Sequence, residues 1–203
     1  WTISRDYQRE REMNGLLVAI KSEIFVALRT FASKLIVTAP ALVAATQLML
    51  VKLTEAGQQT RDSILGGGSF EQSVANNAYG FFVDGLITGL TMLGLLLVAQ
   101  GAYSFSYDRD VGSIRHLLIR RVSRSSVLTA KLIHLHLLAL LSVLLLLTTS
   151  YLLSGMLWEY GAIVEDGFEL ISEQEIREEI GLGLRLALVP LPAAIALGLL
   201  ISV

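Results

Sequence analysis

Four long apolar stretches constrain this chain most, because each is long enough to cross a membrane as a helix. The hydrocarbon core of a bilayer is about 30 Å thick, and a helix needs roughly 20 apolar residues to cross it. Four internal stretches reach this length, at residues 35–53, 79–102, 132–153 and 182–203. None resembles a cleavable signal peptide, since each lies inside the chain and has full spanning length. The sequence therefore predicts an all-α, polytopic helical membrane protein with four transmembrane helices.

The composition excludes several classes of function. Hydrophobic residues make up 53% of the chain and charged residues 17%, whereas soluble domains are about a quarter charged. There is no cysteine, so disulfides, thiolate metal sites and cysteine nucleophiles are excluded. Three scattered histidines argue against a catalytic zinc site, and we expect no bound metal. A net charge of −2 indicates no nucleic-acid partner.

The distribution of lysine and arginine predicts the orientation in the membrane. Six of the sixteen lie in residues 1–34 and six in residues 103–131, and only four lie elsewhere. Basic residues accumulate on the cytoplasmic side of membrane proteins. We therefore expect a cytoplasmic N-terminus and central loop in the cell (inner or plasma) membrane, and outer loops at 54–78 and 154–181.

Residues 1–34 are predicted to form an amphipathic helix that does not span. Apolar residues recur at helical spacing from Met13 to Phe31, and charged residues such as Glu23 lie largely on the other side. This pattern is typical of a helix lying in the cytoplasmic interface. The alternative is a solvated helix that packs on a soluble partner.

The outer loop 154–181 is acidic, and its segment 172–180 has the pattern of a short amphipathic helix. Such a helix would either cap the structure in solvent or contact an external, periplasmic partner. In the fourth apolar stretch, Pro190 and Pro192 each remove a backbone donor, so a kink is expected there.

The loop between the second and third spans, residues 103–131, has the most informative pattern. Asp110 and Ser113 are capping residues, so a short helix should begin near Ser113. Ser123, together with Ser125 and Ser126, offers a cap for a second helix that runs into the third span. Basic residues here are explained by anchoring to anionic lipid, but an apolar face on the short helix favours docking on a cytoplasmic partner.

The same loop resembles the cytoplasmic signature of ABC-2 type transporter permeases. In that family an acidic residue precedes a Gly-Thr/Ser-Leu/Ile step, a Leu-Leu pair, Pro-Val-Ser-Arg and a later lysine. This chain has Asp108, Gly112-Ser113-Ile114, Leu117-Leu118, Val122-Ser123-Arg124 and Lys131 in that order. It departs from the pattern at Arg121, where the family usually has proline, and at Asp108, where glutamate is commoner. Members usually have six spans, so the resemblance covers the first four, and we expect the domain to continue beyond Val203.

The resemblance implies a transport subunit of an ABC exporter that is not itself an enzyme. In this family the loop contacts a separate ABC ATPase subunit, which holds ATP and Mg, and two permease units form a homo- or heterodimer. This chain has no Walker A pattern of its own. The residues implied in coupling to the ATPase partner are Asp108, Asp110, Gly112, Ser113, Arg115, Leu117, Leu118, Arg120, Arg121, Ser123, Arg124 and Lys131.

The second span contains further candidate residues. Asp84 is the only acidic residue within a span, and it is either a pathway residue or an interfacial one. Gly85 and Gly89 form a GxxxG pattern that allows close helix packing, either in a dimer or within the subunit.

Two other functions compete with transport. A non-transporting membrane anchor or scaffold for a cytoplasmic complex would account for the basic and acidic loops without a pathway. A membrane-embedded enzyme would need several converging carboxylates or histidines, and only Asp84 qualifies.

Overall fold

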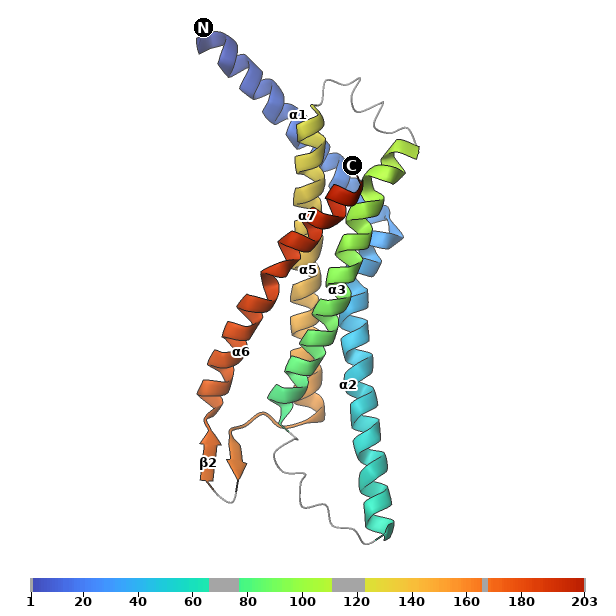
Figure 1. Ribbon diagram of the computed structural model, residues 1–203, viewed down its shortest axis with the longest axis vertical. Helices are drawn as coiled ribbons and strands as arrows, with labels where there is room; N and C mark the ends of the chain where they lie inside the picture. The colour runs from blue at the N-terminus through green and yellow to red at the C-terminus, as the bar shows by residue number, and fades with distance from the viewer. Residues whose placement is uncertain (1, 66–76, 111–122, 166–167, 203) are drawn as a thin grey trace. The chain divides into compact units, whose positions relative to one another are not determined.

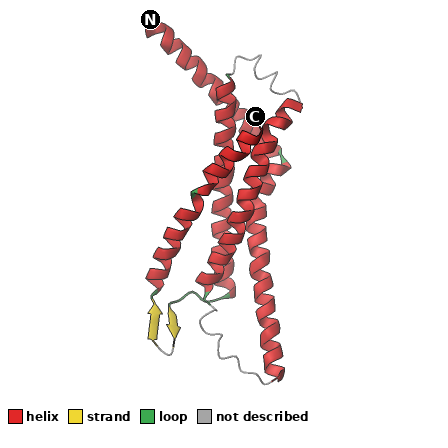
Figure 2. Ribbon diagram, viewed as in Figure 1, coloured by secondary structure: helices red, strands yellow, loops and turns green. Residues whose placement is uncertain are grey.

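The computed structural model describes residues 2–65, 77–110, 123–165 and 168–202. Nearly all of them are helical (Figures 1 and 2). The helices are α1 (Thr2–Arg29), α2 (Phe31–Leu65), α3 (Ala78–Asp110), α5 (Arg124–Leu157), α6 (Glu173–Leu188) and α7 (Pro190–Ser202). Strands β1 (Ile163–Glu165) and β2 (Phe168–Ile171) precede α6.

Four segments are long and apolar enough to cross a membrane, which is the character of an integral membrane protein. They are Phe31–Gly57, Ala78–Ser104, Ser125–Leu157 and Glu173–Ser202. Each includes one of the four apolar stretches seen in the sequence, apart from the last residue of the chain. The predicted all-α membrane fold is therefore confirmed at this level.

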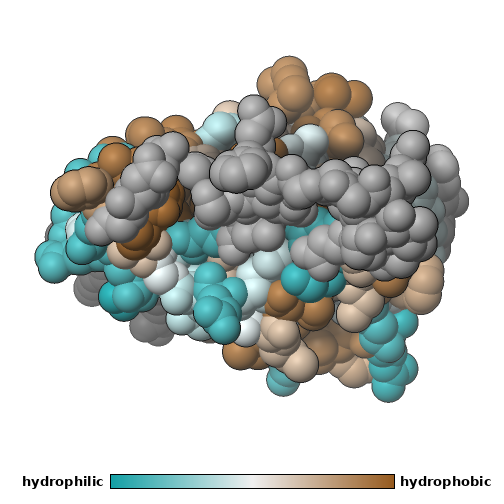
Figure 3. All heavy atoms as spheres, turned by 90° about the horizontal axis from the view of Figure 1, so that it is seen from below, coloured by the Kyte–Doolittle hydropathy of each residue, from teal (hydrophilic) through white to brown (hydrophobic). Residues whose placement is uncertain are grey.

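The surface of these helices is rich in large apolar side chains. Leu42 and Leu53 in α2 and Leu140 and Leu152 in α5 are all more than half exposed. Brown hydrophobic residues lie beside teal hydrophilic ones in the view along the bundle (Figure 3). Soluble monomers rarely expose so much contiguous apolar surface, whereas helices in contact with lipid do so because the lipid tails are equally apolar.

The hairpin of β1 and β2 is a departure from the predicted all-α fold. The strands are antiparallel, with Val164 opposite Glu169 and Glu165 opposite Phe168. The sequence between them is Asp-Gly, a pair typical of two-residue hairpin turns. This local signal was overlooked because the strands are only three and four residues long.

The fourth span consists of two helices. Ser172 caps α6 by accepting a hydrogen bond from the Glu175 amide, 3.3 Å away. Acidic residues in the first turn stabilise the helix further, because they interact favourably with the positive end of its dipole. The predicted acidic helix 172–180 is thus the start of α6. The helix ends at Leu188, and α7 begins at Pro190, where a missing amide hydrogen costs nothing. The span is therefore divided into two helices just before Pro190, whereas Pro192 lies inside the first turn of α7.

The chain divides into two compact units. The first comprises Trp1–Val37, Leu93–Leu141 and Pro190–Val203, and the second comprises Thr38–Met92 and Ser142–Val189. In the first unit, Ala19 and Ile20 of α1 pack on Val127 and Ala130 of α5.

The second unit has two core clusters. Phe82 and Leu86 of α3 pack with Ala44 of α2 and Leu146 of α5, and α6 covers this cluster with partly buried apolar residues. Towards the hairpin, Leu48 and Ala78 pack with Trp158.

Candidate functional site

The predicted ATPase-coupling segment lies mainly outside the described residues. Asp108 and Asp110 fall in the last turn of α3, and Arg124 is the first residue of α5. The structure describes the backbone alone at these three positions. The predicted residues that lie outside the described part are Gly112, Ser113, Arg115, Leu117, Leu118, Arg120 and Arg121.

Ser123 caps α5, as its position in the sequence predicts. Its hydroxyl oxygen accepts a hydrogen bond from the Ser126 amide at 3.1 Å and lies 2.7 Å from the Ser126 hydroxyl. Capping of this kind satisfies one of the free amide groups at a helix start and typically contributes about 1 kcal/mol. The start of α5 is therefore defined by a local interaction.

Lys131 lies two turns into α5 and joins three helices of the first unit. Its side chain is 3% exposed. The ammonium Nζ is 3.0 Å from Oε1 of Glu23 in α1 and donates a hydrogen bond to the carbonyl oxygen of Ser104 in α3, at 3.4 Å. We call these three residues the Lys131 junction.

Small apolar side chains lie beside the Lys131 junction on both α1 and α5. Ala19 lies one turn before Glu23 in α1, and Ala130 lies beside Lys131 in α5; both are buried in the contact between the two helices. An unpaired charge buried in such surroundings costs several kcal/mol, so the lysine requires its carboxylate partner. The ion pair thus specifies how α1 lies against α5.

Sequence reasoning selected Lys131 and missed its two partners. Glu23 was assigned to the polar side of an interfacial helix, but the structure turns it towards α5. The available signal was a lysine in an otherwise apolar helix, since buried lysines are almost always paired. The exposed residues of α1 include the apolar Leu17 and Leu28 and the basic Lys21.

The candidates in α3 lie in different environments. Asp84 is exposed. A Cβ atom added to Gly85 would lie 3.2 Å from the Ser150 hydroxyl, and one added to Gly89 would clash with the Leu146 side chain. The two glycines therefore sit at a close contact between α3 and α5 of one chain.

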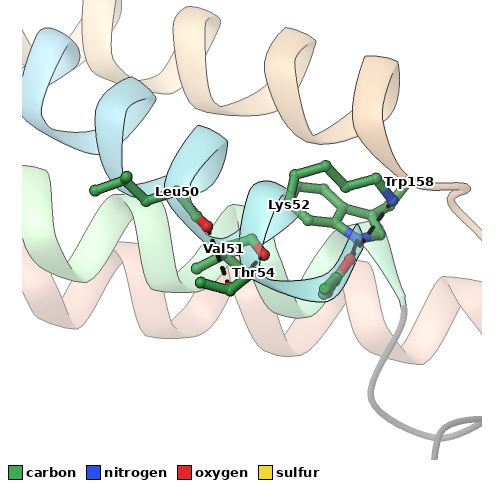
Figure 4. Close-up of polar contacts among 6 residues, drawn as sticks. Leu50, Val51, Lys52, Thr54 and Trp158 are labelled. Atoms are coloured by element: carbon green, nitrogen blue, oxygen red, sulfur yellow. Dashed lines mark hydrogen bonds and ion pairs between the residues drawn. The ribbon is translucent and has the colours of Figure 1, made fainter. Parts of the chain in front are cut away.

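A second group of polar and aromatic residues gathers where α2 approaches the end of α5. The Trp158 indole donates a hydrogen bond to Oε2 of Glu55 at 3.0 Å. Lys52 lies 4.9 Å from the centre of the indole ring and 3.5 Å from the same carboxylate oxygen (Figure 4). Phe81 of α3 stacks on Trp158 at 3.9 Å. These four residues, which we call the Trp158 cluster, join α2 and α3 to the end of α5.

Tyrosines extend this network to the start of α6. The Tyr79 hydroxyl donates to Oε1 of Glu173 at 2.7 Å, and the Tyr160 hydroxyl donates to the Tyr151 carbonyl at 2.7 Å. Burial is the main cause that raises the pKa of Tyr160 to about 12, with smaller contributions from Tyr151 and Tyr79. The sequence analysis predicts neither the Trp158 cluster nor the tyrosine contacts, although aromatic residues at the ends of apolar spans are a known signature of membrane interfaces.

The Lys131 junction and the Trp158 cluster are both contacts between helices. Within the described residues, no group of three or more histidine, aspartate or glutamate side chains could hold a metal ion. His136 uses Nδ1 to contact the Leu132 carbonyl of its own helix at 2.8 Å. Both assemblies join helices, so their chemistry is suited to transmitting or resisting movement between helices.

No protein-family model matches this chain, and neither a curated protein nor a solved structure shows significant similarity to it.

Proposed function

We propose that the chain is a permease subunit of an ABC-2 type exporter, which moves its substrate with energy from ATP hydrolysis on a partner subunit. The observation that carries this proposal is the order and spacing of the motif from Asp108 to Lys131. Four helices of spanning length support a transport role. The finer features, namely the cytoplasmic N-terminus, the cell membrane and the dimer of permeases, belong to the same proposal.

In this proposal, residues 112–124 form the coupling helix that docks on the ABC ATPase. ATP and Mg bind to the ATPase, whose closure moves the coupling helix. Lys131 follows this segment by two helical turns and contacts both Glu23 of α1 and Ser104 of α3. Because a buried ion pair resists separation, α1 and the start of α5 would move together with the docked segment.

Substitution of the three arginines tests the proposal. We would purify the tagged chain from native membranes in mild detergent, unaltered and as R120A/R121A/R124A. The matched control is R177A/R185A, which removes exposed arginines of α6. We expect an ATP-binding subunit to accompany the unaltered chain and the control but not the triple variant.

Each result discriminates between the competing functions. If an ATPase accompanies all three forms and ATP turnover stays coupled to transport in the triple variant, residues 112–124 are not the coupling site. If no ATPase accompanies the unaltered chain and other cytoplasmic proteins do, the membrane scaffold replaces the transporter.

A further inference from the structure

An apolar groove separates α3 from α6 in the second unit. It has a volume of about 380 Å³ and is lined on the α3 side by residues including Val83, Ile87 and Leu90. The α6 side includes Glu179, Gly183 and Ala187. We call this feature the α3/α6 groove. Apart from the carboxylate of Glu179, its walls are made of hydrocarbon side chains and glycine.

The groove lies beside the contact that Ile180 and Leu184 of α6 make with the α3 cluster, where α6 also carries small residues. Gly183 and Ala187 are one turn apart and therefore share a face of α6. A Cβ atom added at Gly183 would meet nothing within 4 Å, so the space beside it is open. The two helices nevertheless meet before the groove, since the Tyr79 hydroxyl donates to Glu173.

The groove has a polar end and an apolar end. Glu179 lies at the end nearer the start of α6, and Glu175, one turn earlier, is exposed on the same face. From Glu179 to Ala187 the helix rises about 12 Å. One leaflet of a bilayer has a hydrocarbon depth of about 15 Å. Because the fourth apolar stretch begins at residue 182, just after Glu179, we place the polar end of the groove near the interface, and its length then fits within one leaflet.

We propose that the α3/α6 groove binds one acyl chain of a phospholipid whose headgroup carries an ammonium, such as phosphatidylethanolamine. The chain lies along Gly183 and Ala187, and the ammonium lies beside the carboxylates of Glu179 and Glu175. Because the groove lies wholly in the second unit and requires only insertion in a membrane, this inference is independent of the ATPase proposal.

The dimensions of the groove favour an acyl chain over another protein helix. A helix with its side chains is about 10 Å wide and crosses both leaflets, so it would need a contact along the whole span. The groove covers about two turns of α6. The acidic residues at its polar end complement an ammonium and repel an anionic headgroup.

Photolabelling in vesicles tests the proposal. The full chain would be reconstituted with phosphatidylethanolamine or phosphatidylglycerol that carries a diazirine in one acyl chain, and the labelled peptides would be identified by mass spectrometry. We expect phosphatidylethanolamine to label residues 83–90 and 179–187 in preference to other exposed apolar residues. Phosphatidylglycerol should label them about fivefold less, the factor expected for about 1 kcal/mol per charge near the membrane surface.

Substitutions at two places test the contact with the acyl chain and the contact with the headgroup separately. Gly183→Leu should fill the groove and lower labelling about tenfold, which corresponds to about 1.4 kcal/mol. Gly181→Leu is the matched control, since Gly181 is not part of the groove lining and an added Cβ there also meets nothing within 4 Å. The double variant E175Q/E179Q should leave chain labelling in place and remove the preference between the two lipids.

Three results would overturn the proposal. The first is labelling spread evenly over all exposed apolar residues. The second is equal labelling of the groove in Gly183→Leu and Gly181→Leu. The third is a groove protected from lipid by crosslinks to a second copy of the chain, which would identify it as a protein interface.

Discussion

At the residue scale, the buried charge of Lys131 needs its ion-pair partner more than the charge of Glu23 does. The lysine side chain is 3% exposed and the glutamate 19%, so the carboxylate retains some access to polar surroundings. We expect Glu23→Gln to lower the free energy of unfolding by about 3 kcal/mol, because it removes the carboxylate that neutralises the buried Lys131 ammonium. Lys131→Met should cost less, since methionine keeps most of the apolar volume. Thermal unfolding in detergent measures both changes.

A charge swap provides the control for this pair. The double variant E23K/K131E should recover part of the stability lost in Glu23→Gln, because it restores opposite charges at the same two positions. If Glu23→Gln unfolds at the same temperature as the unaltered chain, the Lys131 junction does not hold α1 on α5.

Ser150 presents the opposite situation, a buried polar group without a partner. Its hydroxyl is fully buried and makes no hydrogen bond, and the close approach of Gly85 leaves little space beside it. Removing an unsatisfied buried group is favourable by about 1 kcal/mol, so we expect Ser150→Ala to raise the unfolding temperature. Thr148→Ala is the control, since the Thr148 hydroxyl is bonded to the Leu144 carbonyl at 2.8 Å. A lower unfolding temperature for Ser150→Ala would mean that the hydroxyl is used in the membrane.

At the scale of elements, α3 and α7 of the first unit touch through two glycines. A Cβ atom added at Gly198 would lie 2.7 Å from the Val98 carbonyl oxygen, and one added at Gly101 would lie 2.9 Å from the backbone of Gly198. Backbone atoms cannot rotate away as side chains do. We therefore expect Gly198→Ala to push the helices apart and to cost about 1–3 kcal/mol in unfolding experiments.

Gly94 in α3 is the matched control for this prediction. An added Cβ at Gly94 meets nothing within 4 Å, so Gly94→Ala should keep or slightly raise stability through better helix propensity, by about 0.5–1 kcal/mol. Equal stability of Gly94→Ala and Gly198→Ala would contradict a tight contact between α3 and α7.

The elements also show which parts of the fold can be predicted from sequence. The apolar stretches, the Ser123 cap and the interruption at Pro190 depend on local composition, and all three are present. The partners of Lys131 and Trp158 are distant in the sequence, so they depend on how helices pack. No periodicity within one segment contains that information.

The predicted site divides in the same way. Lys131 is predicted through its place in a motif, whereas the carboxylate that neutralises it comes from a helix whose charged residues are predicted to lie largely on its polar side. The structure shows Glu23 beside buried Ala19 on the side that faces α5. A single charged residue on the mostly apolar side of a helix cannot be recognised from the sequence, because an amphipathic pattern remains clear when one position departs from it.

At the scale of the whole molecule, charge is divided between the two ends of the spans. Twelve of the sixteen basic residues lie in residues 1–34 and 103–131, whereas residues 154–181 are strongly acidic. Translocation of basic segments is unfavourable, so this division should hold 1–34 and 103–131 in the cytoplasm. This predicted orientation depends on charge alone and does not require any partner.

The absence of cysteine allows this orientation to be measured with single introduced thiols. Tyr107 in α3 and Phe168 in β2 are both exposed aromatic residues, so Tyr107→Cys and Phe168→Cys form a matched pair. On intact cells, a maleimide that cannot cross membranes should label Phe168→Cys at once and Tyr107→Cys only after permeabilisation. The reverse pattern would invert the predicted orientation and place residues 103–131 outside the cytoplasm, out of reach of the ATPase that we propose as a partner. Labelling of both thiols on intact cells would show that the chain between them does not separate two compartments.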